Sequence, residues 1–488
     1  MQNRQHYLSK SVQVLLIGGV AAILGYAIPF NTMVVIPFIL VLMMLIYMRI
    51  VLESYHKILL FIILVIPFNL KIGVGIPFVN IFNLLWVSYV GIVVLRAVTY
   101  SEPILVKSPL TFPILLVVAV FTISCIQAKW VVSPYNFSAM VFPTYQKWVQ
   151  WLFFYFFCMR GIRNEKQAKQ TIIFVTLMVF IAGYFNIKDY MGMASSTKGD
   201  NLQRAAGLFG NANASACFFC SFAPTAMGLA LARIKDWKMQ IYFTVVSLVG
   251  VFAVISTYSR NGMATIGLLS CMIIFFCKVN IKVSLVLLTL VFLLASSDNI
   301  QKRFSQTSTK DIYGQVKLDY SVLARLTAWS KALYLVKKSP VIGHGFYSFR
   351  SISVEKYNGL MLKYHGSTHM ATHNGYLNIL TGAGIVGMLV FLYFIFSCMK
   401  LAWDIFSKTT DPFWKGASIG IFTGMIGLLI FNGSGIRFYD RRGVAYFWIL
   451  LGALYKGHEY YEARIKSKEQ KHRADNSENK IQKHKYIN

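Results

Sequence analysis

The chain has few charged residues, and acidic ones are the scarcest: 18 Asp and Glu stand against 48 Lys and Arg among 488 residues. Charged residues make up 14% of the chain, whereas soluble domains carry about 25%. Composition therefore excludes an ordinary soluble protein. The chain also contains no Asp-x-Asp sequence, and its 7 cysteines all lie inside apolar runs, where a thiol packs as a small hydrophobe. We therefore expect neither a metal site nor a disulfide framework.

Long apolar runs, in contrast, fill almost the whole chain. Hydrophobic residues make up 56% of it, and runs of about 18 apolar residues suffice to cross a bilayer. We therefore expect an all-α polytopic membrane protein with about 12–14 transmembrane helices. The first run follows Arg4 and Lys10 but lacks a cleavage site, so it is predicted to be a retained helix. The predicted spans are 11–30, 32–48, 57–70, 80–96, 109–127, 146–160, 171–190, 213–232, 239–257, 262–278, 281–296, 374–400, 416–432 and 441–455.

The distribution of basic residues predicts the orientation in the cell (inner) membrane. Cytoplasmic loops collect Lys and Arg, and the short connections 160–169 and 233–238 are basic, whereas the turns 30–32 and 73–77 are nearly uncharged. Both termini are therefore predicted to be cytoplasmic. The net charge of +30 follows from these loops and from the basic tail, so it does not indicate nucleic-acid binding. We expect that tail, residues 456–488, to be solvated and disordered.

One connection, residues 297–372, is long and polar. Counting the predicted spans from a cytoplasmic N-terminus places this connection outside the cell membrane. We expect a small external lid made mostly of helices. Within it, Leu326, Trp329, Leu333 and Val336 recur at helical spacing and predict one apolar face of an amphipathic helix. Ser339-Pro340 should end this helix, and two glycines, Gly343 and Gly345, should turn the chain.

We divide the chain into four parts on these grounds. Residues 1–199 form an N-terminal transmembrane bundle, and residues 200–400 form a catalytic core that includes the external loop. Residues 401–455 add C-terminal transmembrane helices before the basic cytoplasmic tail, 456–488.

Four ionisable residues are predicted to lie at the outer membrane boundary: Arg204, Arg260, Arg325 and His373. A charge at this depth is costly, which favours a functional role. Guanidinium groups bind phosphate oxygens through a planar fork, so three of them indicate a ligand with a diphosphate. A histidine at a helix N-terminus stays neutral and can act as a general base. Each residue alone is more typical of a snorkelling anchor or a hydrogen-bonded structural histidine, and only their coincidence on one side favours function.

Four stretches resemble the O-antigen ligase and polymerase superfamily of bacterial envelope assembly. They are RAAGLFGNANASA (204–216), YSRNG (258–262), RLTAWSKALYLVKKSPVIGHGFYSF (325–349) and THNGYLNILTGAGIVGM (372–388). The last two are the most specific. The resemblance covers about residues 200–390, and the earlier spans match only in general character. Ala212-Asn213 departs from the family pattern, in which a proline precedes the second asparagine.

The resemblance implies a metal-independent, inverting glycosyltransferase with a fold like that of the glycosyltransferase C superfamily and without cofactor or nucleotide. The donor would be a glycan linked to undecaprenyl pyrophosphate, and a flippase and a chain-length regulator would be candidate partners. Arg204, Arg260 and Arg325 would hold the diphosphate, and His373 would activate the acceptor hydroxyl on the outer face. Trp329 and Asn374 would shape the site.

Several functions remain open at this stage. The basic external loop favours a polymerase that holds an acidic chain, such as teichuronic acid, capsule or O-antigen, over a ligase that transfers the finished glycan to a lipid or protein. A metal-dependent glycosyltransferase usually needs acidic residues in an early external loop, and the stretches 71–77 and 129–147 have none. A transporter or flippase usually has ionisable groups near the bilayer midplane, whereas here the charges gather at one face.

Overall fold

The computed structural model describes residues 55–68, 81–100, 106–194, 204–232, 234–279, 308–310, 316–318, 320–352 and 371–485. This part of the chain is helical apart from short 3-10 and π turns and one antiparallel pair of three-residue strands, β1 (Ser308–Lys310) and β2 (Val316–Leu318). Within it, 6 helices are long and apolar enough to cross a membrane. They are α5 (Thr111–Val131), α8 (Glu165–Ala194), α9 (Ala212–Leu231), α10 (Trp237–Ser256), α16 (Gly375–Lys408) and α17 (Pro412–Gly433).

These helices confirm the predicted class of an all-α polytopic membrane protein. Each of the other predicted spans overlaps a helix, but the helices that begin at Gly375 and Arg441 continue well past the predicted ends at 400 and 455. The spans predicted at 11–30, 32–48 and 281–296 lie outside the described ranges. The remaining helices are α3 (Tyr55–Val65), α4 (Ile81–Tyr100), α6 (Pro134–Asn136), α7 (Phe142–Gly161), α11 (Arg260–Phe276), α14 (Tyr320–Lys338) and α18 (Arg441–Lys485), with the π turn η1 (Phe137–Val141) and the 3-10 turns η2 (Gly207–Phe209) and η3 (Ser348–Ser351).

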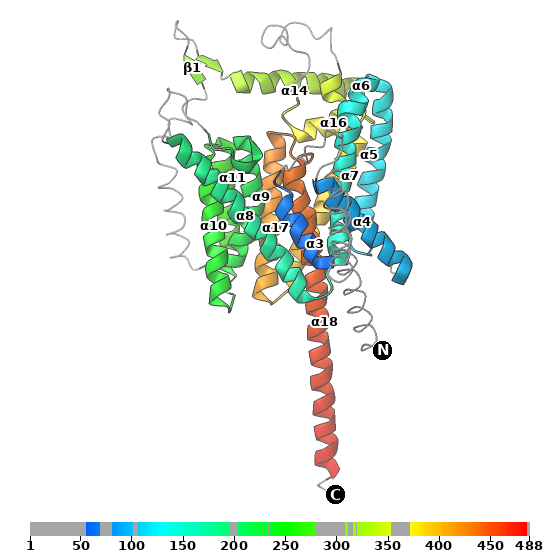
Figure 1. The fold of residues 1–488 in the computed structure, drawn as a ribbon, viewed down its shortest axis with the longest axis vertical. Helices are drawn as coiled ribbons and strands as arrows, with labels where there is room; N and C mark the ends of the chain where they lie inside the picture. Colours follow the sequence, from blue (N-terminus) through cyan, green and yellow to red (C-terminus); the bar gives the residue numbers. More distant parts are fainter. Residues whose placement is uncertain are drawn as a thin grey trace, which may run out of the picture.

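Most long helices run side by side, and α14 lies across one end of this bundle (Figure 1). We call this the α14 end. The last half of α18 leaves the bundle at the opposite end (Figure 1), which we call the α18 end. The tail from residue 456 was expected to be disordered, and this was wrong up to Lys485, because α18 continues as one helix. Its Lys, Glu, Gln, Arg and Ala residues are strong helix formers, and Lys456 pairs with Glu459 at 2.9 Å one turn later.

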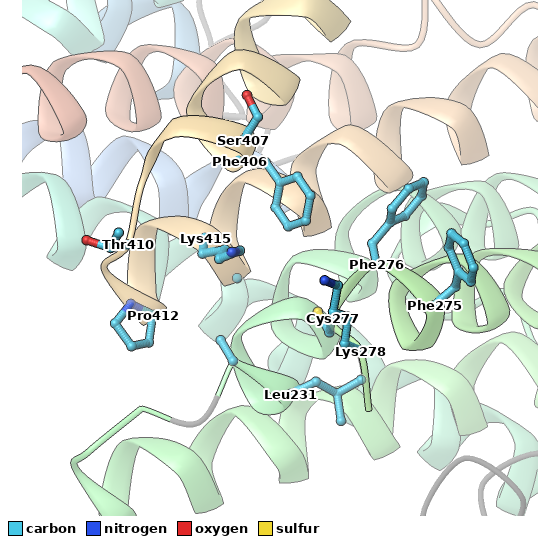
Figure 2. Close-up of a pocket in the computed structure, with 12 residues that line it drawn as sticks. Leu231, Phe275, Phe276, Cys277, Lys278, Phe406, Ser407, Thr410, Pro412 and Lys415 are labelled. Carbon is cyan, nitrogen blue, oxygen red and sulfur yellow. The ribbon is translucent and has the colours of Figure 1, made fainter. Parts of the chain in front are cut away.

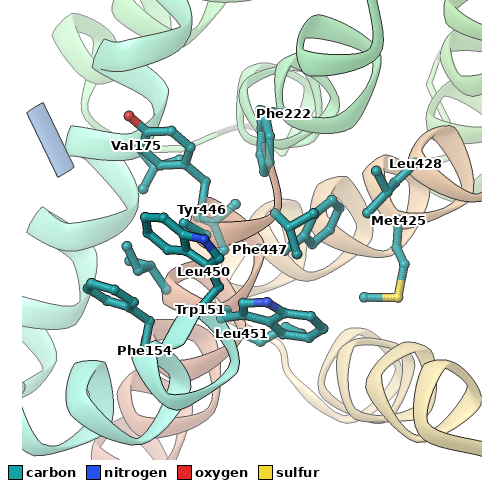
Figure 3. Packing of buried hydrophobic residues seen from close by; sticks show 14 of the residues in the cluster. Trp151, Phe154, Val175, Phe222, Met425, Leu428, Tyr446, Phe447, Leu450 and Leu451 are labelled. Atoms are coloured by element: carbon teal, nitrogen blue, oxygen red, sulfur yellow. The ribbon is translucent and has the colours of Figure 1, made fainter. Parts of the chain in front are cut away.

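One continuous apolar core joins the bundle. Figure 3 shows its centre, where Trp151 of α7, Phe222 of α9, Met425 of α17 and Tyr446 of α18 meet. Helices from both halves of the chain share this core.

Glycines bring α9 and α17 into backbone contact. On α17 they recur every four residues, at Gly416, Gly420 and Gly424. A Cβ on Gly424 would lie 2.1 Å from the backbone oxygen of Ser221 on α9, and a Cβ on Gly420 would lie 2.4 Å from that of Pro224. Such small-residue seams let membrane helices approach closely and associate by van der Waals contact.

α16 is interrupted at Gly384, whose φ of 63° and ψ of −163° are not helical. The segment after α14 supplies the hydrogen bonds that the interruption removes. The amides of His344 and Gly345 donate to the carbonyl oxygens of Thr381 and Gly382 at 2.8 and 2.7 Å. The amide of Ile385 donates to the carbonyl oxygen of Pro340 at 2.9 Å. We call this contact between residues 340–346 and 381–386 the α16 interlock.

α5 also holds the α16 interlock. The Ser124 hydroxyl donates to the carbonyl oxygen of Gly382 at 3.0 Å, and the Gln127 amide donates to that of Gly343 at 2.9 Å. Gly343 and Gly345 have φ values of 70° and 99°, so the predicted turn is confirmed. A Cβ on Gly345 would lie 2.4 Å from the Cα atom of Ala128 on α5. Glycine is therefore required there both by the backbone angle and by the lack of space.

α14 confirms the helix predicted at residues 325–338 and ends at Lys338, just before Ser339-Pro340. Within the apolar face predicted on this helix, Leu326 and Leu333 are 43% and 53% exposed. The face that packs on the bundle instead carries Thr327, Ala328, Lys331, Ala332 and Leu335. Its small residues allow α14 to lie close to η3 and α16, whereas the pattern of large apolar residues follows the opposite, exposed side.

A buried lysine fastens α14 to η3. The Lys331 ammonium donates to the carbonyl oxygens of Phe349 and Ile352 at 3.2 and 2.7 Å, and it lies 4.7 Å from the centre of the Phe349 ring. Burial lowers the pKa of Lys331 to about 8, because the apolar surroundings disfavour the charged form.

The α16 interlock predicts that Gly384→Ala unfolds this region. A Cβ at Gly384 would lie 2.2 Å from the carbonyl oxygen of Val341, in a backbone conformation that side chains rarely adopt. We expect the free energy of unfolding to fall by about 3 kcal/mol or more, measured by thermal unfolding of detergent-purified protein followed by tryptophan fluorescence.

Gly267→Ala is the matched control, because a Cβ at Gly267 in α11 would meet nothing within 4 Å. It should leave stability unchanged or raise it by up to about 1 kcal/mol, since alanine favours helix. Equal stability of the two variants would contradict the role of the α16 interlock.

Candidate active site

The four residues singled out from the sequence all lie at the α14 end. α9, α11, α16 and α18 begin at this end, and α8, α10 and α17 finish there. Arg204 precedes η2 and α9, and Arg260 is the first residue of α11. Arg325 lies on α14, and His373 lies two residues before α16. Because the first turn of a helix carries partial positive charge, this end of the bundle favours anionic groups.

His373 has a constrained backbone conformation. Its φ of 49° lies in the left-handed region, which is uncommon for a residue with a side chain. The neighbours fix this conformation: the Thr372 hydroxyl donates to the carbonyl oxygen of Asn374 at 2.9 Å. The Asn374 side-chain oxygen accepts from the amides of Tyr376 and Leu377 at 2.9 and 3.1 Å, as an N-cap. Asn374 therefore positions His373 and starts α16.

The surroundings of His373 keep its imidazole neutral. The residue as a whole is exposed, yet partial burial of the ring lowers its pKa below the ordinary value of 6.5, and the charges of Arg325 and Arg437 lower it further. Two guanidinium groups therefore lie near His373, one from α14 and one from the connection between α17 and α18. A neutral imidazole can accept a proton, as a general base must.

Arg204 and the Arg260 turn form one hydrogen-bonded unit. The Arg204 Nε donates to the carbonyl oxygen of Thr257 at 3.0 Å, and its guanidinium also donates to the Asn213 Oδ1 at 2.8 Å. The same Asn213 oxygen accepts from the Ser259 hydroxyl at 3.1 Å, and Ser259 caps α11 directly before Arg260. These contacts hold both arginines at adjoining helix ends.

The segment around Arg204 is shaped by an acidic residue that the sequence analysis did not single out. The Asp189 carboxylate, near the end of α8, accepts from the amides of Ala206 and Gly207 at 2.8 and 3.1 Å. Ala212, where the family pattern has proline, is the first residue of α9 after the N-cap Asn211. Proline is favoured at that position but not required, so the departure leaves the local turn intact.

A polar link joins the Arg260 turn to the His373 side of the site. The Asn261 amide donates to the Ser434 hydroxyl at 2.8 Å, after the end of α17. Three residues further, the backbone amide of Arg437 donates to the Asn432 Oδ1 at 3.1 Å. Asn432 lies against the first residue of α16, where a Cβ on Gly375 would overlap its side chain at 1.9 Å. Asn432 thus connects Arg437 to the start of α16, two residues after His373.

Arg437 was missed from the sequence. Its guanidinium lies 3.9 Å from the Asp440 carboxylate, with 17% of the arginine side chain exposed. A signal was present: the predicted topology places the short connection between the spans 416–432 and 441–455 outside, where basic residues are unusual. The four family motifs end at residue 388, so they did not draw attention to it.

Several buried hydrogen-bond donors near this site have no hydrogen-bond partner among the described residues. They are the Nδ2 atoms of Asn378 and Asn432, the Nε of Arg437 and the Nε1 of Trp329. Buried donors are nearly always paired in folded proteins, so a group of them indicates that an oxygen-rich ligand or water completes their hydrogen bonds. Within the described ranges, no three His, Cys, Asp or Glu side chains are grouped as metal ligands.

Comparison with known families finds a similarity over part of the chain. Residues 245–392 match the family model described as O-antigen ligase, and no curated protein matches the chain. The matched range contains Arg260, Arg325 and His373, whereas Arg204 and Arg437 lie on either side of it. The match supports a role as polymerase or ligase in the assembly of envelope polysaccharide. Residues 245–392 are therefore similar to the O-antigen ligase family, which supports the superfamily resemblance that the sequence motifs predicted.

Proposed function

We propose that the chain is a glycan polymerase of the cell membrane. It would join repeat units linked to undecaprenyl pyrophosphate into an envelope polysaccharide on the outer face, without metal or nucleotide. The observation that carries the proposal is the position of a neutral, conformationally fixed His373 beside Arg325 and Arg437, at the same end of the bundle as Arg204 and Arg260.

The chemistry requires a base and a site for the leaving group, and the residues supply both. His373 accepts the proton of an acceptor hydroxyl while the hydroxyl oxygen attacks the anomeric carbon of the donor sugar. The bond between that carbon and the diphosphate oxygen breaks, and undecaprenyl pyrophosphate leaves with the bonding electrons. Attack from the side opposite the leaving group inverts the anomeric carbon. The proton on His373 then passes to solvent or to the released diphosphate.

The arginines would stabilise the charge that develops on the leaving diphosphate. A guanidinium stays protonated at any relevant pH and offers paired donors to phosphate oxygens, and such preorganised donors favour the transition state. Two nearby carboxylates leave this stabilisation of the diphosphate intact, because each has a partner of its own. Asp189 accepts hydrogen bonds from backbone amides, and Asp440 lies beside Arg437.

A ligase would use the same base and the same arginines and differ only in its acceptor. The basic character of residues 297–372 favours a polymerase that holds an acidic chain. A flippase and a chain-length regulator remain candidate partners.

Reconstitution tests the proposal directly. Purified protein is supplied with undecaprenyl-pyrophosphate-linked repeat units without metal or nucleotide, and products are resolved by length on a gel. We expect a ladder from the wild type and a rate lower by about 10²–10⁴ for His373→Ala, the usual loss of a general base.

His472→Ala serves as the control, because His472 is exposed on the part of α18 that leaves the bundle. It should give a normal ladder. Products that appear only after a lipid or protein acceptor is added would show a ligase. A full ladder from His373→Ala would rule out His373 as the base.

The pH dependence tests the arrangement of charges around His373. A base must be neutral, so kcat/KM should fall as the pH drops through the lowered pKa of His373, below its ordinary value of 6.5. Arg437→Gln removes one cause of the lowering. The pKa then rises, and the acid limb of the kcat/KM profile should move to higher pH.

Arg464→Gln is the matched control, because Arg464 pairs with Glu165 at 3.2 Å at the α18 end. Its profile should coincide with that of the wild type. An unmoved acid limb in Arg437→Gln would mean that Arg437 does not act on the catalytic base.

A further inference from the structure

A cavity lies at the α18 end, far from the candidate active site. It has a volume of about 690 Å³ and lies between the ends of α9, α11 and α16 and the start of α17 (Figure 2). Ligand pockets usually have volumes of about 300–1,000 Å³. Nothing in the proposed glycosyl transfer uses this cavity, since every residue of that site lies at the opposite end of the same helices.

The cavity contains two cations and no carboxylate. Lys278, after the end of α11, and Lys415, in the first turn of α17, both line it. Neither ammonium group has a hydrogen bond or ion pair to a described residue; Lys415 lies only over the Phe406 ring, 5.5 Å from its centre. Two acidic residues close in sequence to the lining have partners of their own, because Asp404 pairs with Lys400 at 2.6 Å and Asp411 caps α17. The charge of this cavity therefore suits an anion.

Lys278 also has an unusual backbone. Its φ of 48° lies in the left-handed region, where the residue after a helix is usually glycine. The amides of Lys278 and Val279 donate to the carbonyl oxygens of Phe275 and Ile274 at 3.2 Å each and close the helix end. The described residues contain four non-glycine residues with positive φ, and the other three are Tyr258, Tyr347 and His373 at the α14 end. Such conformations concentrate at functional sites.

The rest of the lining is mostly apolar, with the hydroxyl groups of Ser407 and Thr410 among it. Phe275, Phe276 and Phe406 line the cavity, and Phe275 is 75% exposed. The cavity is bounded by the ends of the membrane-spanning helices α9, α16 and α17. Trp237 and Trp403, 66% and 36% exposed, belong to the same end of the bundle, and exposed tryptophans mark the membrane–water interface.

We infer that this cavity binds an anionic phospholipid, with the head-group phosphate between Lys278 and Lys415 and an acyl chain against the aromatic wall. A single molecule with a phosphate beside a hydrocarbon chain matches both halves of the lining. A basic pocket between membrane helices is the kind of site that recognises such head groups. The inference is independent of the glycosyl-transfer proposal.

A binding measurement in detergent tests the inference. Purified full-length protein is titrated with phosphatidylglycerol carrying a fluorophore on one acyl chain, and with the matching phosphatidylcholine. We expect phosphatidylglycerol to bind more tightly. The double variant Lys278→Gln/Lys415→Gln should lower its affinity by about 30-fold, from the usual contribution of two lysines near an anionic lipid. Lys278→Arg/Lys415→Arg should retain binding.

The control removes the same charge outside the cavity. Lys235, just before α10, and Lys238, in the first turn of α10, are exposed at the same end, so Lys235→Gln/Lys238→Gln should change affinity less than about twofold. Ser407→Trp narrows the cavity at constant charge and should weaken binding as the lysine variants do. An equal loss in both double variants, or no loss in either, would overturn the inference. So would full displacement of the lipid by millimolar inorganic phosphate, because the acyl chain would then contribute nothing.

Discussion

The α16 interlock is the constraint on which the candidate site depends. Helix α16 breaks at Gly384 in the apolar part of the bundle, where unpaired backbone groups cost several kcal/mol each. Residues 340–346 pair with the freed amides and carbonyls, and α5 adds two side-chain hydrogen bonds. The segment that satisfies the break also follows directly after α14. Backbone pairing inside the bundle thereby determines where α14 lies, and with it how near Arg325 comes to His373.

This coupling gives a physical reason for the form of the two most specific motifs. In SPVIGHGF, Gly343 and Gly345 need positive φ and leave no room for a Cβ. In NILTGAGIVG, Gly384 faces the carbonyl oxygen of Val341 at the break. The motifs resemble catalytic signatures, yet most of their residues serve the contact between residues 340–346 and 381–386. Of the side chains in and beside these motifs, His373 and Arg325 are those to which we propose a part in the chemistry.

The sequence predicted those features that follow from local chemistry. Apolar run length located the spans, and the proline and glycines after Lys338 located the end of α14. The packing face of α14 could not be read from its large apolar residues, because docking on η3 and α16 buries Ala328 and Ala332, whereas Leu326 and Leu333 remain exposed. Arg437 was missed because its role follows from proximity to His373, 64 positions away in the chain, and no local pattern encodes that proximity. The helix beyond residue 456 was missed because high charge was taken as disorder, although the same residues favour an isolated helix.

The cationic side chains at the two ends of the bundle are held in different ways. At the α14 end, Arg204 and Arg437 are held by hydrogen bonds or a carboxylate, and their charges are fixed in space before any ligand binds. Such preorganisation suits a transition state, because no reorganisation is needed when charge develops. At the α18 end, Lys278 and Lys415 are exposed and have no polar partner among the described residues. Flexible ammonium groups on an aromatic wall suit a ligand that stays bound without reacting. Rigid arginines at the α14 end therefore suit the proposed transfer of a diphosphate-linked sugar. Adaptable lysines at the α18 end suit the proposed binding of a lipid that does not react.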